Sequence, residues 1–188
     1  MTPPSDADVI RGSLGEPEAF GVIYDRHAAT LLRFLGRRAG AKVADGLLGE
    51  LFRIAFERRK TFDASRASAL PWLYGIGSNL LLKHRRGEAR WLRASARMAA
   101  DLEPADRRGS AAALDARVLF PRVADAIEAL PADERETLLL FAWEELSYQS
   151  VAEALDVPVG TVRSRLNRAR ARLRELIEPK GEKKVKSK

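Results

Sequence analysis

The sequence predicts an all-α fold made of two small helical domains joined by a flexible linker. Its 188 residues suit one large or two small domains, and a content of 46% hydrophobic and 31% charged residues is typical of a soluble globular protein. Apolar residues recur at helical spacing along most of the chain, whereas runs that alternate apolar and polar residues are scarce. Ala99–Ala113 breaks this pattern with Asp, Glu, Pro, Arg, Gly and Ser. We interpret this stretch as the linker.

The N-terminus, residues 1–15, is predicted to be disordered. Met1–Asp8 holds Pro, Ser and Asp in place of a basic start and an apolar run, so no signal peptide is expected. The longest stretches of large apolar residues, such as Leu138–Trp143, are far too short to span a bilayer. The chain has no cysteine, which excludes disulfides and thiolate zinc sites. We therefore expect a cytoplasmic protein that does not engage a membrane.

Three helices are predicted in the N-terminal domain, residues 16–98. They cover Glu16–Arg38, Ala44–Arg59 and Ala69–Arg86, where large apolar residues fall at helical spacing. Pro71 stands near the start of the third helix, where its missing N–H is tolerated because that group would be unpaired anyway. The residues that set the spacing are Phe20, Ile23, Tyr24, Leu31 and Leu35 in the first helix, Leu48, Leu51, Phe52 and Ala55 in the second, and Leu73, Ile76 and Leu80 in the third.

The C-terminal domain, residues 114–178, begins with two further predicted helices. Leu114–Leu130 resumes the helical pattern of apolar residues. Asp133 with Glu136 three residues later resembles a capping box. The apolar stretch Thr137–Trp143 then continues as a helix.

The rest of this domain has the pattern of a helix-turn-helix. Ser147 is placed to cap a short helix that ends at Leu155, and Asp156–Gly160 makes a tight connection to a final helix, Val159–Ile177. A short helix, a tight turn and a longer basic helix are typical of this motif. Residues 179–188 are predicted to be a disordered basic tail. Its lysines are Lys180, Lys183, Lys184, Lys186 and Lys188.

Positive charge is concentrated on the final helix. A formal net charge of +7 favours a polyanionic partner, either nucleic acid or an anionic membrane surface. One apolar stripe on this helix consists of Val162, Leu166, Ala169 and Leu173. The other faces carry Arg163, Arg165, Arg168, Arg170, Arg172 and Arg174. The preceding segment, Asp125–Asp156, is rich in Asp and Glu, so the basic charge falls on the element that would enter a DNA major groove.

Side chains near the start of this helix are candidates for reading DNA bases. An arginine can donate two hydrogen bonds to guanine, and Asn167 could pair with adenine in the same way. The residues at the base-facing positions are Arg163, Ser164, Asn167 and Arg168. The remaining arginines, Arg165 among them, are expected to contact phosphate or solvent. The competing interpretation is an arginine-rich helix that faces only solvent.

Three stretches of the C-terminal half carry a longer pattern. They are Ala-Leu-Pro-Ala-Asp-Glu-Arg-Glu from Ala129 through Leu-Ser-Tyr at 146–148, Val-Ala-Glu-Ala-Leu from Val151, and Val-Pro-Val-Gly-Thr-Val-Arg-Ser-Arg-Leu-Asn-Arg-Ala-Arg from Val157. Together they resemble the C-terminal domain of extracytoplasmic-function (ECF) sigma factors of bacterial RNA polymerase. In that family this domain binds the minus-thirty-five promoter element. The resemblance places the same four base-facing residues at DNA-contacting positions, and Tyr148 near the DNA backbone.

The N-terminal half resembles the other conserved domain of the family. Phe20–His27 opens it, Ala44–Phe52 lies where the family has its polymerase-binding helix, and Phe62–Leu80 matches the part that binds and opens the minus-ten element. The resemblance assigns polymerase binding to Asp45, Leu48, Glu50, Leu51 and Phe52. It assigns the minus-ten element to Phe62, Asn79, Lys83, Arg85 and Arg86, with the loop Phe62–Ala67.

Strand opening requires groups that hold unpaired bases. Aromatic or amide side chains beside a basic surface do this by stacking, hydrogen bonding and phosphate contact. Phe62, Trp72, Asn79 and the basic run Lys83–Arg86 supply these residue types. For Trp72 a core position is favoured, because it lies among apolar neighbours. For Phe62, a core position and a base contact are equally open.

Two glycines depart from the family pattern in the polymerase-binding helix. The family usually has an acidic residue where Gly46 stands and a glutamine where Gly49 stands. Two glycines in a helix cost roughly 2 kcal/mol relative to alanine, and they remove two polar side chains from the expected contact. They keep open a second hypothesis, a helix-turn-helix regulator that binds duplex DNA without productive polymerase engagement. Gly75 and Gly77 are expected to loosen the helix before Asn79.

Enzyme chemistry finds little support, and we expect no catalytic residue, no metal and no cofactor. His27 and His84 are the only histidines, and neither has a second histidine or a cysteine nearby. No glycine-rich loop ending in Gly-Lys-Ser/Thr occurs. An enzyme acting on nucleic acid through an unrecognised site is the third hypothesis. The favoured hypothesis is a sigma factor that binds core RNA polymerase and promoter DNA and, as the resemblance implies, an anti-sigma protein.

Overall fold

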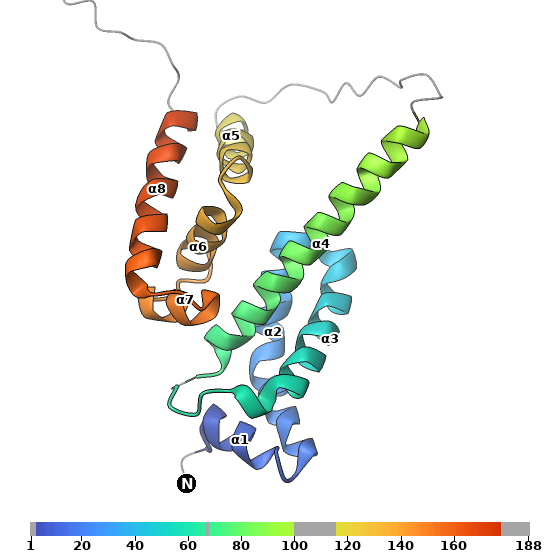
Figure 1. The fold of residues 1–188 in the computed structure, drawn as a ribbon, viewed down its shortest axis with the longest axis vertical. Coiled ribbons are helices and arrows are strands. Elements are labelled where there is room, and N and C mark those ends of the chain that lie inside the picture. The colour runs from blue at the N-terminus through green and yellow to red at the C-terminus, as the bar shows by residue number, and fades with distance from the viewer. Residues whose placement is uncertain (1–2, 67, 100–115, 178–188) are drawn as a thin grey trace, which may run out of the picture. The chain divides into compact units, whose positions relative to one another are not determined.

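The computed structural model describes residues 3–66, 68–99 and 116–177. Within these ranges the regular structure is entirely helical, so the predicted all-α fold is confirmed. In chain order the elements are α1 (Asp6–Gly12), the 3₁₀ helix η1 (Pro17–Phe20), α2 (Gly21–Ala39), α3 (Ala41–Arg58), the 3₁₀ helix η2 (Arg59–Thr61), α4 (Leu70–Ala99), α5 (Ala116–Glu128), α6 (Ala132–Ala142), α7 (Tyr148–Leu155) and α8 (Val159–Ile177) (Figure 1). The last helix has the predicted bounds, whereas α4 is longer than predicted.

The described helices form two compact units by their contacts. One unit contains α1 to α4 together with residues Gln149–Asp156, and the other contains α5, α6 and α8. Residues 100–113 of the predicted linker and the predicted basic tail at 179–188 lie outside the described residues.

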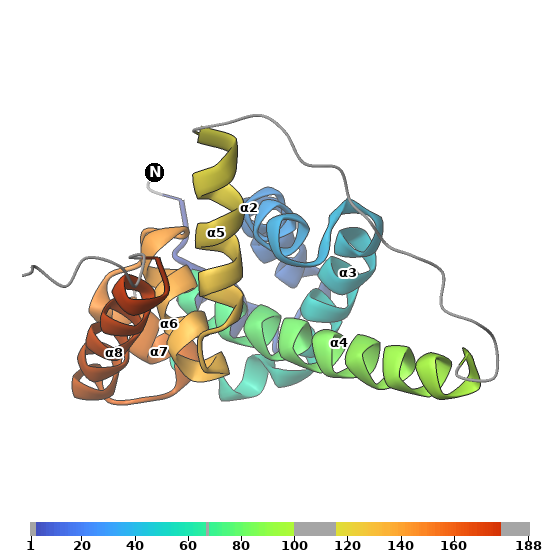
Figure 2. The same ribbon diagram turned by 90° about the horizontal axis from the view of Figure 1, so that it is seen from above.

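The core of the first unit lies among three long helices. α2 packs against α3 and α4, and α3 packs against α4 as well, as two views at right angles show (Figures 1 and 2). The most deeply buried side chains include Leu31 and Phe34 from α2, Leu51 from α3, and Leu73 and Tyr74 from α4. The rings of Phe34 and Tyr74 meet edge to face, with centroids 4.9 Å apart. This packing fixes the outward faces of α3 and α4 relative to each other.

Gly77 lets these three helices approach closely. A Cβ atom at Gly77 would lie 2.9 Å from Cε1 of Phe34 and 3.1 Å from Cδ1 of Leu51, and both of those side chains are fully buried. α4 runs without a break through Gly77, and the missing side chain there makes room for packing. Gly46 and Gly49 differ, since a Cβ at either position would meet nothing within 4 Å.

The N-terminal residues are ordered in part, contrary to the prediction of disorder over residues 1–15. Residues Asp6–Gly12 form α1, and the Ser5 hydroxyl accepts a hydrogen bond from the N–H of Asp8 at 3.2 Å, which caps the helix. Val9 and Ile10 on α1 are 7% and 2% exposed. The helix is therefore anchored by its apolar face as well as by its cap.

A buried carboxylate attaches α1 to two other segments of the first unit. Asp6 is 7% exposed, and its oxygens accept hydrogen bonds from Nη1 of Arg26 at 2.8 Å and from the backbone N–H of Ala69 at 2.9 Å. Nε2 of His27 lies 2.8 Å from Oδ2, the oxygen that also accepts the hydrogen bond from Ala69. Arg26 and His27 belong to α2, and Ala69 precedes α4 directly. One side chain thus joins α1, α2 and the start of α4.

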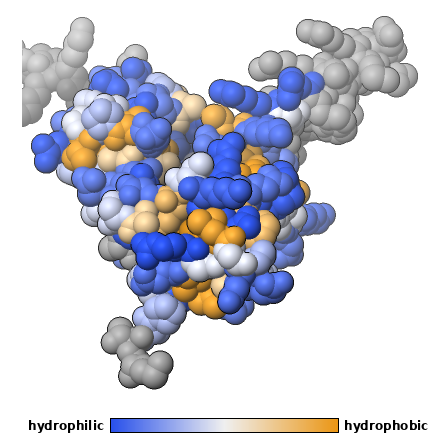
Figure 3. Space-filling model, turned by 60° about the horizontal axis from the view of Figure 1, so that its bottom comes forward, coloured by the Kyte–Doolittle hydropathy of each residue, from blue (hydrophilic) through white to orange (hydrophobic). Residues whose placement is uncertain are grey.

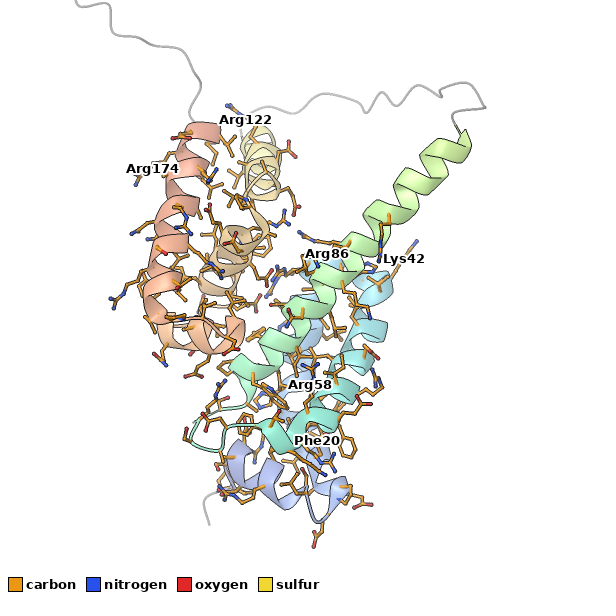
Figure 4. All side chains as sticks on the ribbon, in the orientation of Figure 1. Phe20, Lys42, Arg58, Arg86, Arg122 and Arg174 are labelled. Carbon is orange, nitrogen blue, oxygen red and sulfur yellow. The ribbon has the colours of Figure 1, made fainter. Side chains whose placement is uncertain are left out.

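In the second unit, α8 packs against α6 and α5. Val162, Leu166 and Ala169 of the predicted apolar stripe are fully buried, whereas Leu173 is partly exposed. Nη2 of Arg122, labelled in Figure 4, donates a hydrogen bond of 3.2 Å from α5 to the last carbonyl of α8. The apolar stripe therefore leaves the arginine-bearing faces of α8 on the outside.

The predicted capping box at Asp133 and Glu136 is wrong. α6 begins at Ala132, its N-cap residue is Pro131, and no side chain caps it. Asp133 therefore lies inside the first turn, where an acidic side chain is favoured by the helix dipole. Its carboxylate pairs with Arg165 of α8 instead of with the backbone of α6.

The turn before α8 is tight, as predicted. α7 begins directly after Ser147, where the sequence placed its N-cap. Asp156 lies between α7 and α8 with φ of 52°, a left-handed conformation that aspartate tolerates better than most residues.

Candidate nucleic-acid interface

The first turns of α8 present polar side chains to solvent. Arg163, Ser164 and Asn167 are all exposed, and Arg163 forms no ion pair with the residues that the structure describes. The Ser164 hydroxyl donates to the carbonyl of Thr161 at 2.9 Å, so its oxygen is left to accept a further hydrogen bond. The structure thus brings three of the four predicted base-contacting residues to one exposed end of the helix.

Acidic residues of α6 hold three other arginines of α8. Nε of Arg165 lies 3.2 Å from Oδ2 of Asp133. Nε of Arg168 donates to Oε1 of Glu134 at 3.0 Å, and Nε of Arg172 lies 3.0 Å from Oε2 of the same carboxylate. Arg168, the fourth predicted base-contacting residue, is therefore engaged within the second unit.

Two further arginines of α8, Arg170 and Arg174, are exposed and form no ion pair with the described acidic residues. The guanidinium of Arg170 lies over the ring of Phe141, 5.7 Å from its centroid. The Phe141 ring also contacts that of half-buried Tyr148, with centroids 5.2 Å apart. Arg174 projects from α8 on the side away from α5 and α6 (Figure 4). Arg163 and Arg174 are therefore directed outward, whereas the other four arginines of α8 each contact a side chain of α6.

A second polar surface follows one face of α4. Trp72, Asn79, Lys83, Arg86 and Arg90 are separated by seven, four, three and four residues, a spacing that keeps them on one side of a helix. The last four are exposed, and Trp72 is half-buried. We call these five residues the α4 stripe. Arg90 is absent from the sequence prediction, although the same helical spacing extended by one turn leads to it.

An aromatic pair lies at the N-terminal end of the α4 stripe. The rings of Phe62 and Trp72 are both half-buried, with centroids 5.2 Å apart. Neither ring is in the core, so the favoured interpretation of Trp72 as a core residue holds only for part of its surface. Arg85, also predicted for this surface, is half-buried beside the α4 stripe.

Hydrogen bonds to the carboxylate of Asp63 stabilise the loop that carries Phe62. Asp63 accepts hydrogen bonds from the Ser65 N–H at 3.0 Å and from the Ser65 hydroxyl at 2.7 Å. These bonds lower the pKa of the Asp63 carboxyl below its ordinary value of 3.8, so it is ionised at neutral pH. Nε of Arg66 lies 3.6 Å from the same carboxylate. Ala67, the last residue of the predicted loop, lies outside the described residues.

Hydrophilic residues predominate on one face of the structure. Figure 3 shows this face, on which hydrophilic residues surround smaller apolar patches. The large apolar side chains that are exposed are Leu14, Val22, Tyr24, Trp143 and Leu176. The described residues contain no group of three or more His, Cys, Asp or Glu side chains arranged to hold a metal. In the same ranges no helix is long and apolar enough to cross a membrane.

Comparison with known proteins gives matches to both units. The domain family "Sigma-70 region 2" matches residues 23–91, and "Sigma-70, region 4" matches residues 121–173. The ECF RNA polymerase sigma-E factor of Haemophilus influenzae is 29% identical over 182 residues, which cover 91% of this chain and 94% of that protein. The RNA polymerase sigma factor CnrH of Cupriavidus metallidurans is 30% identical, with coverage of 96% and 99%. The chain belongs to the ECF sigma factors.

This sigma factor directs the initiation of transcription by RNA polymerase. The region 2 match extends over α2, α3 and most of α4, and the region 4 match extends from α5 into α8. Because both regions are present, the alternative of a helix-turn-helix regulator without polymerase engagement is not favoured.

Solved sigma factor structures have the same fold. CnrH in complex with the cytosolic domain of CnrY superposes with a TM-score of 0.59 at 26% identity, covering 94% of this chain and 100% of that one. The sigma factor RpoE in complex with the anti-sigma factor NepR from Bartonella quintana gives a TM-score of 0.57 at 23% identity, covering 87% and 99%.

The predicted polymerase-binding residues of the sigma factor fall into two groups. Leu48, Leu51 and Phe52 are 6%, 0% and 7% exposed, because they form the apolar face with which α3 packs into the core. Asp45 is exposed, and Glu50 is half-buried and pairs with the guanidinium of Arg53 at 2.7 Å, which lowers the pKa of Glu50. The prediction that the three apolar residues contact a partner directly is therefore corrected. They hold α3 in place, and of the five predicted residues Asp45 and Glu50 are the two that offer side chains outward.

Proposed function

We propose that this sigma factor recognises the upstream promoter element with the first two turns of α8. Arg163 and Asn167 are exposed four residues apart on one face of the helix, a spacing that lets both reach base edges in a major groove. Ser164 lies between them with an oxygen that can accept a hydrogen bond. The observation that supports this most is the state of Arg163, which is exposed and forms no ion pair with a described acidic residue. Its neighbours Arg165 and Arg168 are held by acidic residues of α6.

Of the other predicted upstream residues, Arg165 and Tyr148 are assigned to the DNA backbone, whereas Arg168 is held by Glu134 of α6. Arg165 and Arg168 bind acidic residues of α6 through Nε, which limits the directions that their remaining N–H groups can take. Tyr148, held against Phe141, has its hydroxyl as its only polar side-chain group. Contacts from Arg165 and Tyr148 to phosphate would orient α8 without adding sequence information.

The minus-ten element is assigned to the α4 stripe and the loop before it. Phe62 and Trp72 offer partly exposed ring faces on which an unpaired base can stack, and Asn79 offers an amide to hydrogen-bond its edge. Lys83, Arg86 and the added residue Arg90 continue the α4 stripe and can bind successive phosphates of one strand. This arrangement of rings, amide and cations along one helix face fits single-stranded DNA better than duplex.

Core RNA polymerase is assigned to the outward face of α3. Asp45 and Glu50 are acidic side chains of that face, Glu50 pairs with Arg53, and a Cβ at Gly46 or Gly49 would meet nothing within 4 Å. The chain supplies no catalytic residue in this proposal, and the chemistry of RNA synthesis belongs to the polymerase.

An inhibitory protein in the cytoplasm is a further proposed partner. The solved relative RpoE is bound to the anti-sigma factor NepR, and CnrH is bound to the cytosolic domain of CnrY. By analogy, an anti-sigma protein would compete with polymerase for this chain.

The proposed division between duplex and single-strand surfaces can be tested with one double variant. Lys83→Ala/Arg86→Ala in the full-length protein should weaken binding to single-stranded minus-ten DNA and leave duplex upstream DNA unaffected. The slope of log affinity against log salt on the single strand should become shallower by about 1.4, since each phosphate contact on a single strand contributes about 0.7. Fluorescence anisotropy across a salt series measures both quantities.

The matched control is Arg33→Ala/Lys42→Ala, which removes the same charge from exposed positions on α2 and α3. It should leave the slope on the single strand unchanged. An equal loss on single-stranded and duplex DNA in the Lys83→Ala/Arg86→Ala variant would contradict the proposed division.

A further inference from the structure

Glu134 is a buried carboxylate placed between two arginines of α8. Its side chain is 4% exposed, although it lies in the first turn of α6. Nε of Arg168 donates to Oε1 at 3.0 Å, and Nε of Arg172 lies 3.0 Å from Oε2. The two arginines are four residues apart, one turn of the helix, and each is 52% exposed. One carboxylate of α6 therefore holds two cations on the helix proposed to enter DNA.

The pairing is asymmetric, because a buried carboxylate depends on the arginines more than they depend on it. A carboxylate removed from water is strongly destabilised unless it is paired. Oε2 accepts no hydrogen bond from the described residues, so Arg172 stabilises it by charge and proximity alone. The half-exposed guanidinium groups, in contrast, could be solvated or could bind a phosphate if the carboxylate were absent. The free energy gained by the ion pairs therefore comes chiefly from stabilising the buried carboxylate of Glu134, not from stabilising the two arginines.

This pairing changes what α8 can offer to the DNA backbone. Binding to any DNA sequence gains affinity from each phosphate that a free cation neutralises, and the salt slope changes by about 0.9 for each one. An arginine already paired with a carboxylate contributes less to that sequence-independent affinity. Arg163, which is not paired, keeps its full capacity to contact DNA. Glu134 thus weakens the phosphate contacts of Arg168 and Arg172, which do not distinguish sequences. It leaves unchanged the base contact of Arg163, which does.

We propose that Glu134 is a positioning residue that sets promoter selectivity by withholding Arg168 and Arg172 from DNA phosphates. This inference rests on the proposed function of α8 as the DNA-reading helix. The competing explanation is that the pair only fastens α6 to α8. A fastening role predicts lower stability and similar affinity losses on all DNA, whereas withholding predicts a gain on non-specific DNA.

The deciding experiment compares Glu134→Gln with the wild-type full-length protein by fluorescence anisotropy. Two duplexes are titrated between about 50 and 200 mM salt. One carries the upstream element identified by run-off transcription, and the other carries a scrambled sequence. On the scrambled duplex the slope of log affinity against log salt should become steeper by about 1 to 2, because one or two arginines are freed. The ratio of promoter to scrambled affinity should fall several-fold.

Asp125→Asn is the matched control for the change in charge. Asp125 is exposed on α5, and no described ion pair joins it to an arginine of α8. The control adds the same unit of positive charge without freeing an arginine, so it should leave the slope near the wild-type value. Equal slopes for Glu134→Gln and Asp125→Asn would overturn the inference.

A second variant keeps the test valid if Glu134→Gln unfolds. Arg172→Gln should leave the slope on scrambled DNA within about 0.3 of wild type, whereas a residue in full phosphate contact would lower it by about 0.9. A drop of that size would show that Arg172 is not withheld. Failure of the underlying function has a different signature, namely wild-type protein that binds both duplexes equally and is unaffected by Arg163→Ala.

Discussion

Asp6→Ala is expected to lower the free energy of unfolding of the first unit by about 2–4 kcal/mol. The change leaves the buried N–H of Ala69 without its acceptor, and it removes the carboxylate that Arg26 and His27 share. Urea denaturation followed by circular dichroism measures the loss. Asp8→Ala is the control, because Asp8 is an exposed aspartate of the same helix and contacts only its neighbours Ser5 and Arg11. Similar effects of the two substitutions would contradict the anchoring role of Asp6.

The same carboxylate makes stability depend on pH in the acid range. Burial raises the pKa of Asp6, but hydrogen bonds from Ala69, Arg26 and His27 outweigh it and hold the pKa below the ordinary value of 3.8. A carboxyl whose pKa is lowered by folding stabilises the protein above its unfolded pKa, and this contribution is lost as pH falls through the folded pKa. The stability gap between wild type and Asp6→Asn should therefore be full at about pH 5 and above and should shrink progressively as the pH falls below the ordinary pKa of 3.8. A gap of unchanged size at pH 3 would show that the charge of Asp6 is not what stabilises α1.

Arg163→Ala should weaken binding to the upstream element by about 1–3 kcal/mol, the usual contribution of an arginine that makes two hydrogen bonds to guanine. The loss should be confined to the natural promoter and should be small on a scrambled duplex, since base contacts carry the sequence information. Competition binding of the two duplexes to the polymerase complex formed with each variant measures it.

Arg174→Ala provides the comparison for this effect. Arg174 projects outward near the C-terminal end of α8, beyond the turns proposed to reach bases (Figure 4). It should weaken binding to both duplexes alike and reduce the salt slope by about 0.9, if it contacts phosphate. An Arg163→Ala loss that is equal on both duplexes would assign Arg163 to the DNA backbone and leave Asn167 as the remaining base contact on that face.

The periodicity of apolar residues was sufficient to locate most helices. The stripe Val162, Leu166, Ala169 and Leu173 predicted the face of α8 that packs on other helices, and the first three of these residues are fully buried. Helix ends without such a stripe were harder to place. Asp133 and Glu136 have the residue types and spacing of a capping box, but Pro131 is the N-cap residue of α6 and Asp133 lies inside the first turn.

Features that depend on distant residues could not be predicted in this way. The anchoring of α1 depends on Arg26 and Ala69, which lie 20 and 63 residues from Asp6 in the chain. The division of the α8 arginines depends on Glu134, 34 residues before Arg168. A helical pattern shows that an arginine lies on a polar face, but it does not show which acidic side chain the neighbouring helix brings to that face.

The resemblance to a family likewise identified elements better than side-chain roles. It placed polymerase binding on the helix that contains Leu48, Leu51 and Phe52, and these residues are in the core. A sequence match between relatives preserves core and contact residues together, so it does not separate them. Burial in the structure separates them, and it leaves Asp45 and Glu50 as the candidates for contact.

The most direct test of the central claim is run-off transcription with purified core RNA polymerase on a library of genomic fragments, with and without this protein. New discrete transcripts whose start sites share upstream elements are expected, and Arg163→Ala should reduce all of them. The contradicting result is an absence of new transcripts while the protein still binds duplex DNA in a sequence-specific manner in the same buffer. Gly46 and Gly49 on α3 would then be the first positions to examine for a lost polymerase contact.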